Sequence, residues 1–221
     1  PHHPGVTQPG GGGGGGPGRA GGGGGGGGVV EITYATLAEE PYWGVDDLAA
    51  RVRAHHEKGL NVLIRVDYEQ EQSLPPVDDY VALSEYLAYF RRLGADDRLS
   101  DVYGYVVGSD YNARDASARA PDHLTTPAWY ARVFNGYGEP VNHTDNVVQV
   151  LRAERPEARV IVGPLRPWID DQGGSHMYAK DVPWLNYMNS LVAALDASVQ
   201  NKARAGISLV APDGFDVQAP G

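Results

Sequence analysis

The chain has 221 residues, a formal net charge of −10 and no cysteine. The acidic balance and the lack of a lysine or arginine cluster argue against nucleic acid as a partner, because phosphate binding requires a basic face. The lack of cysteine excludes disulfides and thiol chemistry.

Two glycine runs, at residues 10–16 and 21–28, set the amino-terminal part of the chain apart. Glycine has no side chain to bury and loses more backbone entropy on folding than any other residue. Residues 1–28 are therefore predicted to form a disordered tail or flexible linker. Residues 29–221 form the predicted folded domain.

A strand–helix–strand unit opens this domain. Residues 29–34 are rich in β-branched side chains and predict a strand. A helix capped by Asp46 follows and is expected to end near Gly59. Residues 61–68 predict a second strand, whose nearly continuous apolar start is typical of a strand covered on both faces.

The middle of the chain continues the alternation. Residues 78–93 carry apolar side chains at helical spacing, and Gly94 is expected to cap the end of this helix. Residues 102–108 predict the third strand. Two short helices are then expected, over residues 127–134 and 145–152.

The last third of the chain adds a fourth strand at residues 159–163, a helix at 184–202 and the start of a fifth strand at 213–219. Such alternation implies an α/β fold with parallel strands and right-handed crossovers. A barrel and an open doubly wound sheet both fit it. No dinucleotide-binding glycine pattern follows the first strand, which weakens the open-sheet interpretation.

Polar side chains gather just after the predicted strands, where parallel α/β domains place their reacting groups. Carboxylates serve acid/base chemistry, amides bond hydroxyl groups, and aromatic rings stack on sugar faces. These positions therefore predict a carbohydrate site. Its candidate residues are Arg65, Asp67, Gln72, Ser109, Asp110, Asn112, Arg166, Trp168 and Gln218.

The sequence GSDYN at residues 108–112 resembles the Gly-Asn-Glu-Pro-Asn signature of the large clan of retaining (β/α)8 glycoside hydrolases. The order of the other segments is similar as well. The resemblance implies an incomplete (β/α)8 TIM-barrel-like fold, with about strands two to six present. It also implies that Asp110 is the general acid/base and that Ser109 replaces the asparagine that bonds the sugar 2-hydroxyl. Gln218 stands where a histidine is frequent, and the nucleophile would lie beyond Gly221.

The function that this resemblance implies is hydrolysis of a glycosidic bond in a polysaccharide or cell-wall glycan, without a cofactor and in an extracellular setting. Carbohydrate is then the expected partner. No apolar run approaches the roughly 20 residues of a membrane span, and no signal peptide is visible. Ser109 and Asp110 are both shorter than their family counterparts. They favour an alternative, a catalytically inactive relative that binds carbohydrate.

Structural interpretations stand beside these functional ones. Asp110 could cap the following loop, and Arg65 and Asp67, two apart on a strand, could form an internal ion pair. Trp168 could be a packing residue, and Gln72 could be solvated.

The histidines do not suggest a metal site. His55 and His56 are adjacent on a predicted helix and point in different directions. The histidines at positions 123, 143 and 176 lie in predicted loops without ligand spacing, so no metal is expected.

Overall fold

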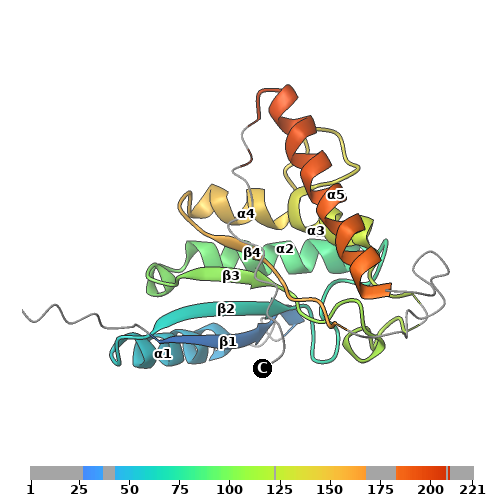
Figure 1. Cartoon of the computed structure of the whole chain (residues 1–221). Helices are drawn as coiled ribbons and strands as arrows, with labels where there is room; N and C mark the ends of the chain where they lie inside the picture. The colour runs from blue at the N-terminus through green and yellow to red at the C-terminus, as the bar shows by residue number, and fades with distance from the viewer. Residues whose placement is uncertain (1–26, 37–42, 122, 168–182, 208, 210–221) are drawn as a thin grey trace, which may run out of the picture.

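The computed structural model describes residues 27–36, 43–121, 123–167, 183–207 and 209. Within these residues the chain forms one sheet of four parallel strands in the order β1-β2-β3-β4 (Figure 1). The strands are β1 (Gly28–Tyr34), β2 (Asn61–Asp67), β3 (Gly104–Val107) and β4 (Val160–Val162). The first four predicted strands and their parallel direction are confirmed.

Two predicted segments lie wholly or mostly outside the described residues. The predicted strand at 213–219 is one of them. The other is the glycine-rich tail, of which the structure describes only Gly27 and Gly28. Gly28 already belongs to β1, which therefore begins one residue before the predicted strand.

The prediction of a (β/α)8 barrel is wrong. The described residues form a four-stranded open sheet, and nothing in its strand pairing closes it. Local patterns indicate that neighbouring strands are parallel, and strands consecutive in sequence are neighbours in the sheet, as is usual in such folds. Closure is a different property, because it depends on strand number, tilt and stagger together. None of these is encoded in a single strand–helix unit.

Five α-helices connect or follow the strands in the described part of the chain (Figure 1). Each is too short or too polar to cross a bilayer. Three of them begin at a side chain that accepts a backbone N–H, as the sequence pattern of helix starts requires: Asp79, Thr126 and Asn146. The helices are α1 (Trp43–His56), α2 (Tyr80–Ala95), α3 (Pro127–Asn135), α4 (Val147–Glu154) and α5 (Pro183–Arg204).

Two predicted helix ends differ from the structure. Asp46 lies inside the first turn of α1, where its charge suits the helix dipole, and is not the cap. Gly94 lies within α2 and does not cap it. A Cβ atom at Gly94 would come within 2.9 Å of a Leu151 methyl, so this glycine allows α2 and α4 to pack closely.

The core lies between the sheet and its helices. Glu31 and Thr33 point to the same face of β1, where Glu31 bonds His55 of α1 and Thr33 bonds Tyr89 of α2. Both helices therefore cover one face. On the other face Val30 is 47% exposed. The helix-facing strand residues Val62, Ile64, Val66, Tyr105, Val107, Val160 and Val162 are buried.

Candidate carboxylate site

The carboxyl ends of β2, β3 and β4 lie side by side, because the strands are parallel and adjacent. The backbone N–H of Gly108 donates to the carbonyl of Val66 at 3.0 Å. The N–H of Asp110 donates to the carbonyl of Pro164, after β4, at 2.9 Å. These bonds place the two carboxylates of interest, Asp67 and Asp110, at one edge of the sheet.

Asp67 is the last residue of β2 and shares a face of the strand with Arg65. Arg65 Nη2 donates to Asp67 Oδ2 at 2.9 Å. The internal ion pair that the sequence suggested is therefore present. Two further atoms of the pair, Asp67 Oδ1 and Arg65 Nε, are buried and have no hydrogen-bond partner among the described residues.

Burial raises the pKa of Asp67 from 3.8 to about 6, although the Arg65 guanidinium opposes this rise. The negative charge of Asp110 raises the pKa of Asp67 further. The two carboxyl groups therefore interact electrostatically, and the buried one retains its proton at mildly acidic pH.

The raised pKa of Asp67 implies that the stability of the protein depends on pH. Folded Asp67 binds its proton more tightly than unfolded Asp67, so the free energy of unfolding falls as pH rises from about 4 to about 6. One pKa unit corresponds to about 1.4 kcal/mol, so the contribution is about 3 kcal/mol. Chemical denaturation at several pH values should show this fall in the wild type relative to Asp67→Asn. Parallel pH curves for the two proteins would contradict it.

Asp110 lies in the turn after β3 and has a left-handed backbone, with φ +51°. The turn is closed by its backbone, since Ala113 N–H donates to the Asp110 carbonyl at 2.8 Å. The side chain instead accepts from Arg166 Nη2 at 3.1 Å, and 40% of it is exposed. Arg166 also binds both carboxylate oxygens of Asp115, at 2.8 and 2.9 Å. The Asp110 carboxylate is therefore accessible from solvent and held by a cation.

Three other candidates are buried and hold the loops around the site. Asn112 bonds the backbone N–H and carbonyl of Arg166, each at 2.9 Å. The amide of Gln72 donates to the Leu74 carbonyl at 2.7 Å and accepts from Arg119 N–H at 2.9 Å. Gln72 is therefore not solvated.

Ser109 is buried as well, and its backbone N–H donates to the Ser73 hydroxyl at 2.8 Å. This bond ties the loop after β2 to the turn after β3. It is made by the backbone of Ser109, so it does not depend on which side chain stands at that position.

Two tyrosines that were not among the predicted site residues hold the ends of β3 and β4 together beneath the site. Tyr130 of α3 donates to the Val107 carbonyl and accepts from Gly163 N–H, both at 2.8 Å. Tyr111 donates to the Gly163 carbonyl at 3.0 Å, and its ring centroid lies 4.1 Å from that of Tyr130. Burial raises the pKa of both phenols. The apolar pattern of α3 indicates that Tyr130 is buried but not which strand end its hydroxyl reaches.

The structure thus brings Arg65, Asp67, Asp110 and Arg166 to one edge of the sheet. Trp168 and Gln218 lie outside the described residues. In the part of the chain that the structure describes, no three histidine or acidic side chains lie together to hold a metal ion.

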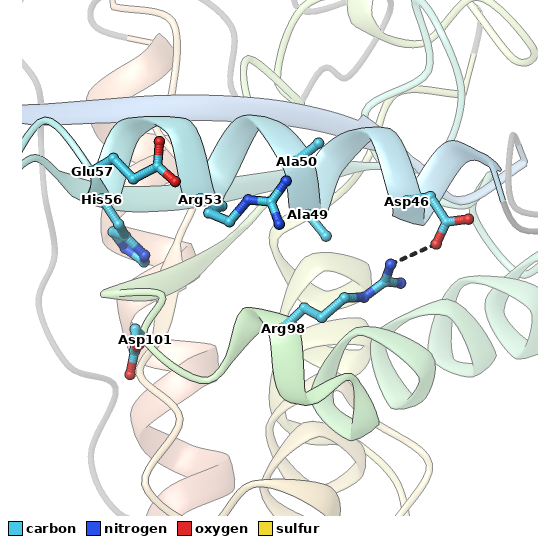
Figure 2. A pocket seen from close by; sticks show the side chains of 8 residues that line it. All are labelled: Asp46, Ala49, Ala50, Arg53, His56, Glu57, Arg98 and Asp101. Carbon is cyan, nitrogen blue, oxygen red and sulfur yellow. Dashed lines mark hydrogen bonds and ion pairs between the residues drawn. The ribbon is translucent and has the colours of Figure 1, made fainter.

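A second feature is a groove of about 530 Å³ along α1 (Figure 2). Its wall contains Arg53, His56 and Arg98 together with three acidic side chains. Arg98 is exposed and binds Asp46 and Asp96, each at 2.7 Å. Charges of both signs and the lack of a buried polar side chain in its wall make this groove a weaker candidate than the Asp67–Asp110 edge.

Comparison with known proteins assigns no family. No family model matches the chain, and no curated protein matches it.

Proposed function

We propose that the Asp67–Asp110 site hydrolyses a glycosidic bond in a polysaccharide or cell-wall glycan by acid/base catalysis. One observation carries this proposal: two carboxyl groups on adjacent strand ends interact while their environments differ. The buried Asp67 has a pKa raised to about 6, and the exposed Asp110 is paired with a guanidinium. Carboxyl pairs in contrasting environments are the usual arrangement for general acid/base work.

The division of roles follows from these environments. Asp67 holds a proton and transfers it to the leaving oxygen as the bond from that oxygen to the sugar carbon breaks. Asp110 takes a proton from the water whose oxygen bonds to the same carbon. Exchange with solvent then restores both groups. Direct attack by water inverts the configuration of the sugar carbon, so this division of roles replaces the retaining mechanism and the acid/base role of Asp110 that the resemblance implies. The resemblance supports only the choice of a glycan, and the assignment of the proton donor to Asp67 rests on its burial.

A second function, carbohydrate binding without cleavage, is favoured by a different observation. Each carboxylate is paired with an arginine, Asp67 with Arg65 and Asp110 with Arg166. Such pairs also suit a static site that only holds hydroxyl groups. Ser109, shorter than the family asparagine, gives this alternative additional support.

The two functions are separated by measuring cleavage and binding together. The full chain is incubated with a panel of β-linked glycans at pH 5, and release of reducing ends and bound glycan are both quantified. We expect cleavage of at least one glycan. Tight binding with no cleavage would replace the catalytic proposal by the binding one. A chain that neither binds nor cleaves any glycan would refute both.

A further inference from the structure

We infer that Asn112 is a positioning residue that fixes the carboxylate of Asp110 through Arg166. This inference rests on the proposed function of the Asp67–Asp110 site. The segments that follow β3 and β4 run side by side, and the side chain of Asn112 joins them. It is fully buried, at 0% exposure.

Three contacts join these segments. Tyr111 reaches the Gly163 carbonyl with its hydroxyl, and Asp110 reaches the Pro164 carbonyl with its backbone N–H. Asn112 then binds both backbone polar groups of Arg166, two residues beyond Pro164. Its side-chain amide thus substitutes for the backbone of a neighbouring strand and continues the pairing beyond the last strand residue.

These two hydrogen bonds, called the Asn112 clamp below, fix the backbone from which the Arg166 side chain extends. The guanidinium of that side chain contacts Asp110 and Asp115. Asn112 also lies within the turn that the Ala113–Asp110 backbone bond closes and in which Asp110 has a φ of +51°. Aspartate adopts a left-handed backbone more readily than most residues but still at some cost in energy, so contacts around the turn help to hold it. Without the Asn112 clamp, we expect the turn to relax and the Asp110 carboxylate to move away from Asp67.

We assign no substrate contact to Asn112. Its amide oxygen and nitrogen are both used by Arg166, and its side chain is enclosed. The substrate-binding role that the sequence suggested for this amide is therefore replaced by a role in holding a carboxylate.

The test is Asn112→Ala in the full chain, assayed on the glycan that the wild type cleaves. A displacement of about 1 Å costs up to roughly a hundredfold in rate, so we expect kcat to fall about 10- to 100-fold with KM nearly unchanged. In an Asp110→Asn background the same change should have little further effect, because the group that it positions is already lost. A full additional loss in that background would overturn the inference, as would a wild-type kcat in Asn112→Ala.

Asn135→Ala is the matched control. Asn135 is also buried, and its amide donates to the Leu195 carbonyl at 3.0 Å, between α3 and α5. It should lower stability while leaving kcat unchanged. If Asn112→Ala does not fold, Asn112→Ser is measured in the same way, since serine also cannot make the pair of hydrogen bonds to the Arg166 backbone.

A second readout does not require activity. The Asp110 charge raises the pKa of Asp67, so displacement of Asp110 in Asn112→Ala should lower the pKa of Asp67 in a carbon-13 NMR titration. Asp110→Asn is the reference for complete loss of that charge. If no glycan is cleaved, the proposed function fails, but the positioning inference is still decided by this titration. An Asp67 pKa that moves in Asp110→Asn and stays constant in Asn112→Ala would overturn it.

Discussion

Gly163→Ala is expected to destabilise the protein by at least about 4 kcal/mol, a loss that places it among the most damaging single substitutions. A Cβ atom at Gly163 would lie 2.2 Å from the carbonyl oxygen of Gly108 and 2.4 Å from that of Val107. Both are backbone atoms, so no change of rotamer relieves the overlap. The ends of β3 and β4 would have to separate.

The same separation would break the hydrogen bonds that Tyr130 makes to Val107 and Gly163. Gly138→Ala is the matched control, because Gly138 has a φ of +79° and nothing within 4 Å of its added Cβ. It should cost only about 1–2 kcal/mol, from the left-handed backbone alone. Urea denaturation of the three proteins measures the difference. Equal losses of unfolding free energy in the two variants would show that the ends of β3 and β4 do not approach each other this closely.

Asp110→Asn is expected to lower the rate of glycan cleavage by roughly 10² to 10⁴. Asparagine has nearly the same shape and keeps an oxygen that accepts from Arg166, so the fold and substrate affinity should change little. The amide cannot accept the proton of water as a carboxylate does. Initial rates under saturating glycan, with circular dichroism to verify folding, measure this effect.

Asp115→Asn provides the comparison for that rate. Asp115 also binds Arg166, but its side chain is largely exposed and no interaction with Asp67 accompanies it. Its replacement should leave the rate within about threefold of the wild type, as expected for loss of a surface ion pair. A small effect at Asp110, or equal effects at the two positions, would remove Asp110 from the reaction.

The parallel sheet and the position of the carboxylates could be predicted because both depend on local patterns. Apolar runs such as residues 62–64 locate strands, and residues that follow parallel strands necessarily share one edge. Asp67 and Asp110 were expected there for this reason. The ion pair of Arg65 with Asp67 follows equally from their spacing of two along a strand.

Other features depend on contacts between distant segments and carry no local signal. Gly94 follows an apolar stripe and therefore resembles a helix cap. A glycine is required there for a different reason, because Leu151 leaves no room for a side chain. Asn112 and Gln72 have the side chains of ligand-binding residues, but both bind backbone groups of neighbouring loops. Whether the sheet closes was likewise beyond local inference, because closure is a property of all strands together.

If Asp67 donates a proton while Asp110 accepts one, kcat must depend on the protonation of Asp67. Measured from pH 4 to 8 on the glycan that the full chain cleaves, kcat should be lost as pH rises through about 6, because Asp67 then gives up its proton. A kcat that stays constant or increases through this range would show that Asp67 is not the proton donor.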